Sequence, residues 1–194
     1  MILVDSPFAN IANIARALRA VDATIEITAD PNAIARASKI VLPGVGSFGA
    51  ACGWLRETRI DAALTEAVVH GAFLLGICVG HQLLFDSSDE MGATRGLGLV
   101  RGDVRKYAGA LPVPQIGWNR VHARGPLFAG VENEAFYFVN SYAARNAAAE
   151  IATADYDGPF TAAVQQGRVF GVQFHPEKSS AAGLRVLRNF AACN

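Results

Sequence analysis

The segment 73–84 constrains the fold more than any other part of the chain, because an apolar run ends abruptly at a cysteine between two glycines, in the sequence FLLGICVGHQLL. The residues before Cys78 are typical of a buried strand, and those after Gly80 have a helical pattern. A strand that turns sharply into a helix is the geometry of a nucleophile elbow, in which small residues such as Gly76 and Gly80 relieve crowding. The positive end of the helix would favour the nucleophilic thiolate.

A second interpretation of Cys78 stays open at this point. A lone cysteine among leucine, isoleucine and valine is commonly a small buried apolar residue with no chemistry. The Gly-x-Cys-x-Gly frame weighs against this interpretation, but a partner base is needed to decide between the two.

The composition indicates a globular protein with a substantial core. The chain has 194 residues, of which 52% are hydrophobic and 18% are charged. This length fits one domain, spanning residues 1–194. The formal net charge is zero and no basic stretch alternates with aromatic residues. We therefore expect no nucleic-acid partner.

Cysteine usage and the N-terminal sequence bear on metals and location. Three cysteines, at positions 52, 78 and 193, have neither metal-ligand spacing nor the even number of a disulfide framework. We expect no metal and no cofactor. The first residues lack a signal-peptide pattern, and no apolar run approaches the length of a membrane span. We therefore expect a cytoplasmic protein with no membrane partner.

Strand and helix patterns alternate through the first half of the chain, with strands predicted at 1–4, 23–28, 39–42 and 72–77 and helices at 11–20, from 31, at 48–56 and 60–70. Later strands are predicted at 99–107, 118–122, 136–139 and 150–156, then a hairpin of 161–164 with 169–174, and a final helix over 180–191. This predicts a single-domain, three-layer α/β fold: an open, mostly parallel sheet with helices on both faces and an antiparallel extension. The active site of such a sheet lies beyond the carboxyl ends of its strands.

A histidine suited to act as a base follows the predicted hairpin, in the segment VQFHPE that ends at Glu177. Pro176 stops the strand, and Glu177 is close enough to His175 to accept a hydrogen bond from its ring. A thiol, an imidazole and a carboxylate together can activate a nucleophile and protonate a leaving amine. The same residues also fit a simple turn with a capping carboxylate.

The segments GICVGHQ and VQFHPE, with a strand-rich region between them, resemble the class I glutamine amidotransferases over nearly the whole chain. The resemblance implies that Cys78 attacks the carboxamide of glutamine, that His175 shuttles the proton and that Glu177 orients His175. It also implies an oxyanion hole built from backbone N–H groups of Val79 and of Val45 or Gly46. The substrate contacts that it implies are Gly44, Gln82, Asn140, Ser141 and Tyr142.

Further segments are similar to the glutaminase subunits of imidazole glycerol phosphate synthases, which serve histidine biosynthesis: LPGVGSF, IGWN, FVNSY and EKS. This resemblance implies a separate (β/α)8-barrel cyclase that docks over Cys78, receives the ammonia, and forms imidazole glycerol phosphate and an aminoimidazole carboxamide ribotide. Candidate interface residues are Trp118, Asn119 and Tyr137, although core packing also explains the two aromatic side chains. Finally, it implies that segment 43–46 completes the oxyanion hole only when the cyclase holds its nucleotide.

Departures from the family pattern leave alternatives open. The segment SPFAN at 6–10 replaces a glycine-rich loop, Asn140 and Gln115 stand where histidine is common, and His81 stands where methionine is common. The chain also fits a paralogue that serves a barrel forming an amidine on a sugar, or a glutaminase for a chorismate-using synthase. A catalytically silent subunit is a further alternative, against which the intact set of thiol, imidazole and carboxylate argues.

Overall fold

The computed structural model describes residues 1–145 and 147–194. Its first elements are β1 (Ile2–Val4), α1 (Ile11–Arg19), β2 (Glu26–Thr28), α2 (Pro31–Ala35), β3 (Lys39–Gly44), α3 (Phe48–Glu57), α4 (Ile60–Val69), β4 (Phe73–Cys78) and α5 (Val79–Gln82). They are followed by β5 (Ser87–Ser88), β6 (Thr94–Arg95), β7 (Asp103–Lys106), β8 (Gln115–Arg120), β9 (His122–Ala123), β10 (Ala135–Asn140) and β11 (Tyr142–Ala144). The last elements are β12 (Glu150–Asp155), β13 (Pro159–Gln166), β14 (Val169–Val172) and α6 (Ser180–Ala191), with short 3₁₀ turns at Pro126–Phe128 and Pro176–Lys178.

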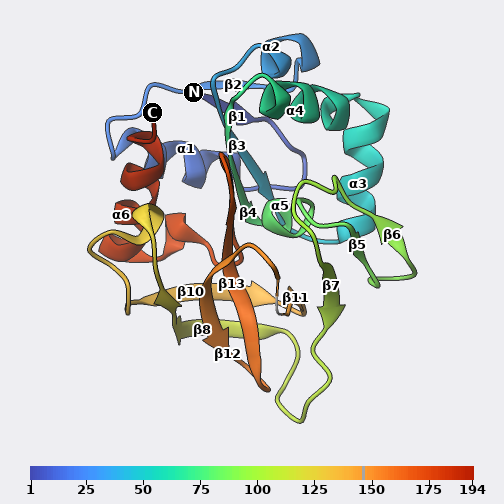
Figure 1. Ribbon diagram of the computed structural model, residues 1–194, viewed down its shortest axis with the longest axis vertical. Coiled ribbons are helices and arrows are strands. Elements are labelled where there is room, and N and C mark those ends of the chain that lie inside the picture. The colour runs from blue at the N-terminus through green and yellow to red at the C-terminus, as the bar shows by residue number, and fades with distance from the viewer. Residues whose placement is uncertain (146) are drawn as a thin grey trace.

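The central sheet has the strand order β2-β1-β3-β4-β14-β13-β12-β9 in the described residues (Figure 1). Neighbouring strands from β2 to β14 are parallel, whereas those from β14 to β9 are antiparallel. Helices α1 and α6 contact each other, and α4 contacts α2 and α3 on the other side of the sheet (Figure 1). The predicted fold, a mostly parallel sheet with helices on both faces and an antiparallel extension, is confirmed.

The sequence patterns explain which elements lie in the centre. After its first residue, each residue of β3 and of β4 is buried, as expected for parallel strands that are covered on both faces. Helix α1 instead buries one stripe that includes Ile14 and Leu18, which are four residues apart. Its start is fixed by Asn10, whose side-chain oxygen accepts the N–H of Asn13 at 3.1 Å.

Two smaller sheets lie beyond the carboxyl ends of the parallel strands: the antiparallel pair β8–β10 and the group β11-β7-β5-β6 (Figure 1). Phenylalanine rings fill the space beneath the β8–β10 pair. Phe136 of β10 stacks on Phe174 with the ring centroids 4.1 Å apart, and Phe138 meets the edge of the same ring at 5.8 Å. This cluster anchors the segment that leads to His175.

The second half departs from the predicted strands in three places. Of the strand predicted at 99–107, only the part Asp103–Lys106 forms a strand, which is β7. Gly102 has a φ of 137° and interrupts the extended chain before it. The strand predicted at 118–122 divides into β8 and β9, which pair with different sheets. Strands β5, β6 and β11 are not predicted by the sequence, because two or three residues are too few to show alternation.

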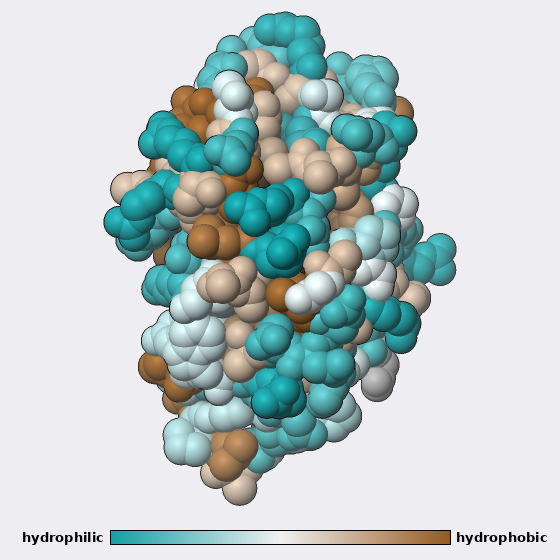
Figure 2. All heavy atoms as spheres, turned by 90° about the vertical axis from the view of Figure 1, so that its left-hand side faces the viewer, coloured by the Kyte–Doolittle hydropathy of each residue, from teal (hydrophilic) through white to brown (hydrophobic). Residues whose placement is uncertain are grey.

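The face drawn in Figure 2 mixes hydrophilic and apolar residues. Among the described residues, no helix is both long and apolar enough to cross a membrane. The same residues contain no group of three or more histidine, cysteine or acidic side chains placed to hold a metal ion.

Candidate active site

Cys78 lies on a strained turn at the end of β4. Its φ of 56° and ψ of −111° are rare for a residue with a side chain, as expected at a nucleophile elbow. The flanking glycines leave no room for larger residues: a Cβ atom on Gly80 would overlap the carbonyl oxygen of Leu42, and one on Gly76 would overlap that of Gly80. The helix that follows, α5, has only four residues, so it is much shorter than its sequence pattern indicates.

His175 reaches the same edge of the sheet from the neighbouring strand. Strand β14 runs parallel to β4, with Val172 opposite Ile77, so both chains leave the sheet side by side. The backbone N–H of His175 donates to the carbonyl of Tyr137 at 2.9 Å, which fixes the exit of the chain. The ring Nδ1 lies 2.9 Å from Oε1 of Glu177, and the two side chains are only 5% and 1% exposed.

The electrostatic environment keeps His175 protonated. Burial lowers the pKa of His175, but hydrogen bonds to Cys78 and Glu177, together with the charges of both, outweigh burial and raise the pKa from 6.5 to about 10. A protonated ring at this position can donate its proton to a leaving amine. The second oxygen of Glu177, Oε2, is buried and has no hydrogen-bond partner in the described residues. Among the described residues, Glu177 therefore forms its side-chain hydrogen bond with the imidazole, through Oε1.

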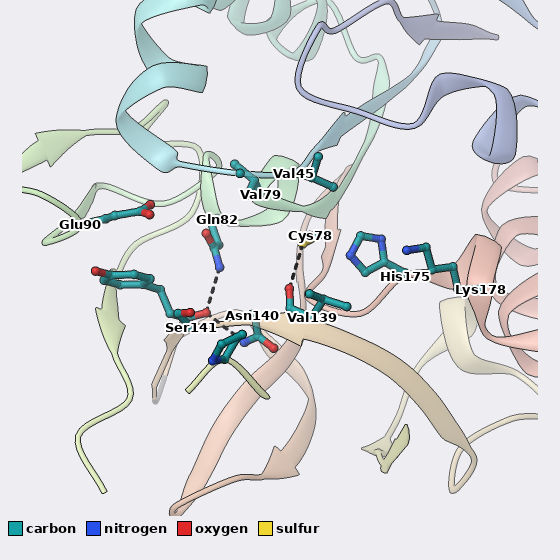
Figure 3. Close-up of a pocket in the computed structure, with 13 residues that line it drawn as sticks. Val45, Cys78, Val79, Gln82, Glu90, Val139, Asn140, Ser141, His175 and Lys178 are labelled. Atoms are coloured by element: carbon teal, nitrogen blue, oxygen red, sulfur yellow. Dashed lines mark hydrogen bonds between the residues drawn. The ribbon is translucent and has the colours of Figure 1, made fainter. Parts of the chain in front are cut away.

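A cleft of about 300 Å³ opens beside the sulfur. Its walls come from the loop at 45–46, the turn at 78–82, the segment 139–142 and the segment 175–178 that follows β14, as Figure 3 shows. The cleft also includes side chains that the sequence analysis did not select: Glu90, Pro114, Val139 and Lys178. Lys178 belongs to the quoted EKS segment, whereas no pattern in the sequence points to Glu90. Its carboxylate accepts the backbone N–H of Phe48 at 2.6 Å, a contact between distant parts of the chain.

The predicted oxyanion loop lies beside the elbow, with one of its N–H groups engaged elsewhere. The N–H of Val45 donates to the carbonyl of Phe8 at 2.5 Å, so it does not point at the sulfur in this structure. Gly46 has a φ of 87° and open space around it, whereas Gly44 packs against the backbone of Gly80. Val79 directly follows Cys78 and lines the cleft (Figure 3).

Three of the predicted substrate contacts, Gln82, Asn140 and Tyr142, form a hydrogen-bonded group along one wall of the cleft. Gln82 donates from Nε2 to the carbonyl of Tyr142 and to Oε1 of Gln173, both at 2.9 Å. Asn140 donates from Nδ2 to the same Tyr142 carbonyl at 3.0 Å and to the hydroxyl of Tyr107 at 2.8 Å. Together with Ser141, these residues line the cleft, whereas Gly44, the remaining predicted substrate contact, lies behind it against the backbone of Gly80.

The predicted interface residues do not share one face. Trp118 is 54% exposed and meets the ring of Tyr137 edge-on, with the ring centroids 6.0 Å apart. Ile116, two residues before Trp118 on β8, is 64% exposed on the same side. Asn119 lies on the opposite side of β8, where its amide donates to the carbonyl of Asp155 at 2.8 Å.

Comparison with known proteins identifies the family to which the chain belongs. Residues 2–193 match the family model for glutamine amidotransferase class-I. The chain is 45% identical to the imidazole glycerol phosphate synthase subunit HisH of Methylococcus capsulatus, over 97% of this chain and 94% of that one. It is 46% identical to the subunit HisH of Thermococcus kodakarensis, over 97% of both chains.

Solved structures share the fold. A crystal structure described as a glutamine amidotransferase has a TM-score of 0.79 at 19% identity, covering 99% of both chains. The glutaminase domain of Trypanosoma brucei CTPS with bound acivicin has a TM-score of 0.66 at 14% identity, covering 97% of this chain and 90% of that one.

Proposed function

We propose that this chain, which belongs to the class I glutamine amidotransferases and within them to the HisH subunits of imidazole glycerol phosphate synthase, hydrolyses glutamine at Cys78 and passes the ammonia to a separate synthase subunit. One observation carries the assignment of the residues. Cys78 and His175 leave adjacent parallel strands at one edge of the sheet, and the ring of His175 is held by Glu177.

The chemistry follows from the protonation states. The thiolate of Cys78 attacks the carboxamide carbon of glutamine and forms a tetrahedral intermediate. His175, protonated at neutral pH, donates its proton to the amine, and ammonia leaves as the thioester forms. The neutral ring then accepts a proton from water, which attacks the thioester and releases glutamate. Glu177 keeps the ring oriented by accepting the N–H at Nδ1 throughout.

Charged groups in the cleft suit an amino-acid substrate. Glutamine carries an α-ammonium group, and Glu90 is the acidic side chain among the residues that line the cleft. The hydrogen bond from Phe48 fixes the position of the Glu90 carboxylate. We assign Glu90 the role of holding the α-ammonium group, which directs the carboxamide of glutamine across the cleft toward Cys78 (Figure 3).

The resting state of the oxyanion loop supports control by the partner. Because the N–H of Val45 is bound to Phe8, this peptide must rotate before its N–H can stabilise the oxyanion. A missing oxyanion donor typically lowers kcat by about a hundredfold or more. In our proposal, Gly44, which supplies the carbonyl of this peptide and has no side chain, makes the rotation sterically easy, and docking of a nucleotide-loaded partner drives it.

The partner that we propose is a (β/α)8-barrel cyclase on a separate chain. It would dock on a face made of Ile116, Trp118, Tyr137 and Lys178, which we call the docking face. The Lys178 ammonium group lies 5.8 Å from the centre of the Tyr137 ring, and Lys178 also lines the cleft. Exposed aromatic residues next to a cleft are favourable anchors for a partner. Ammonia released at Cys78 would therefore emerge beside the bound cyclase.

Replacing the nucleophile tests the reaction. In the complex of both subunits, Cys78→Ala should abolish glutamine-dependent formation of imidazole glycerol phosphate but leave the ammonia-dependent rate unchanged. Cys193→Ala is the matched control, because in the described part of the chain its partly buried sulfur bonds to the carbonyl of Asn189 and to no group of the cleft. Glutamine-dependent activity that survived in Cys78→Ala would contradict the proposed function.

Replacing the aromatic anchor tests the docking face. Trp118→Ala should weaken binding of the cyclase by about tenfold or more, measured by calorimetric titration. Val69→Ala removes an apolar side chain that is 77% exposed on α4, far from the cleft, and should leave the affinity unchanged. Equal affinities of the two variants would show that the cyclase binds elsewhere.

A further inference from the structure

Gln173 is a buried polar residue next to the reacting sulfur. It lies between β14 and His175, its side chain is fully buried, and its backbone N–H donates to the carbonyl of Ala162 at 2.8 Å. Its side chain makes two contacts: Oε1 accepts from Nε2 of Gln82 at 2.9 Å, and Nε2 donates to the sulfur of Cys78 at 3.9 Å. The roles assigned so far leave this residue without a function.

The neighbouring carbonyl determines how both amides are oriented. The backbone oxygen of Tyr142 can only accept hydrogen bonds, so the atom of Gln82 that faces it must be the nitrogen. The same nitrogen faces Gln173, which must therefore present its oxygen to Gln82. The remaining amide nitrogen of Gln173 then points at the sulfur of Cys78. Gln82 therefore donates to Tyr142 and Gln173, and Gln173 donates to Cys78.

We propose that Gln173 is a positioning residue for the glutaminase reaction, which holds the Cys78 sulfur with its N–H and turns the Gln82 amide so that its oxygen faces the substrate. This inference rests on the proposed function of the site. Both N–H groups of Gln82 are used by Tyr142 and Gln173. Its Oε1 is therefore left to accept a hydrogen bond from a donor group of glutamine in the cleft, which Gln82 lines.

The contact with sulfur adds a preference for the charged nucleophile. A hydrogen bond to an ionised acceptor is roughly twice as strong as one to a neutral acceptor, so the Gln173 N–H stabilises the thiolate more than the thiol. The thiol has an alternative, because Cys78 also lies 3.8 Å from the carbonyl of Val139, an acceptor that suits the protonated sulfur (Figure 3). Ionisation of the sulfur thus moves its hydrogen bonding from Val139 to Gln173.

A double-mutant cycle separates the two roles. The variants are Gln173→Met, Gln82→Met and the double variant, each in the complex with the cyclase. Two quantities are measured: KM for glutamine, and the pH midpoint of Cys78 alkylation by iodoacetamide. Gln166→Met at the exposed end of β13 is the matched control. The ammonia-dependent rate of each complex verifies that the variant folds and docks.

The two quantities should respond differently. Gln173→Met should raise KM about tenfold in the wild-type background and have no further effect in Gln82→Met, because both substitutions remove the same oriented amide. The alkylation midpoint should rise by about one pH unit with Gln173→Met in either background. A purely structural role would instead lower the ammonia-dependent rate and leave the midpoint in place. Unchanged KM and unchanged midpoint would overturn the inference while leaving the proposed function intact.

An isosteric variant keeps the test valid if Gln173→Met fails to fold. Gln173→Glu still offers an oxygen to Gln82, but it presents a second oxygen to the sulfur in place of the N–H. At about pH 8.5, where a carboxyl group is ordinarily ionised, we expect alkylation of Cys78 to be slowed at least tenfold. KM for glutamine should stay within threefold of the wild-type value. A wild-type alkylation rate in this variant would overturn the inference.

Discussion

Replacing His81 by methionine should make the protein less sensitive to acid. His81 is fully buried, its ring meets Phe85 edge-on with the centroids 5.1 Å apart, and neither ring nitrogen has a hydrogen-bond partner in the described residues. Nδ1 packs so closely on β14 that a Cβ atom on Gly171 would overlap it. Burial lowers the pKa of His81 from 6.5 to about 3. Methionine fills a similar space without a titratable group.

The sign and size of the effect follow from proton binding. Between pH 6.5 and about pH 3 the unfolded chain binds a proton at His81 that the folded chain does not. The free energy of unfolding is therefore unaffected above the unfolded pKa and falls as the pH falls below it. The loss is about 1.4 kcal/mol for each pH unit, so it reaches about 2 kcal/mol at about pH 5.

Urea unfolding at about pH 7.5 and about pH 5 measures this loss. Wild type should lose about 2 kcal/mol more than His81→Met between the two conditions, because contributions of all other groups, including His175, cancel in the comparison. His70→Gln, which changes an exposed histidine, should behave as wild type. An equal acid loss in wild type and His81→Met would show that the ring is not buried in its neutral form.

The remaining predictions concern the orienting carboxylate and the elbow. Glu177→Gln should lower kcat for glutamine by about a hundredfold. Because the raised pKa of His175 keeps the ring protonated up to about pH 10, wild-type activity should fall as the pH rises through that value, and the fall should begin at lower pH in the variant; identical pH profiles would contradict the role of the carboxylate. Gly80→Ala should lower the free energy of unfolding by about 2 kcal/mol or more, because its Cβ atom overlaps Leu42. Gly53→Ala, in open space on α3, should stabilise the protein by about 0.5 kcal/mol, and a thermal melt that ranked the two variants in the opposite order would refute the steric reasoning.

The sequence is most informative where local pattern and global fold agree. The bounds predicted for the last helix are those of α6, and β3 and β4 follow from their apolar runs. The glycine spacing predicts the elbow at Cys78, because the steric demand of the turn leaves a local trace in the sequence. The position of His175 followed from the proline that ends its strand.

Other features depend on contacts between distant segments and leave no local pattern. Glu90 enters the cleft through a hydrogen bond to Phe48, and the N–H of Val45 is bound by Phe8 from another loop. Gln115 and Asn140, which stand where histidine is common, are joined through the hydroxyl of Tyr107. Gln173 does leave a local trace, because it is a polar residue between Val172 and Phe174 in an otherwise apolar run.

The late position of β14 in the sequence also affects the risk of aggregation while the chain is being synthesised. Strand β4 is apolar on both faces, and one of its edges is closed only by β14, which begins at Val169. While the ribosome is still making the intervening residues, that edge carries unpaired backbone groups beside exposed leucines, a combination that recruits other chains. Nascent chains truncated before Val169 should therefore aggregate or bind chaperones. Strand β14, which brings the imidazole close to the thiol, therefore also covers the edge of β4 and should protect the newly made chain from aggregation.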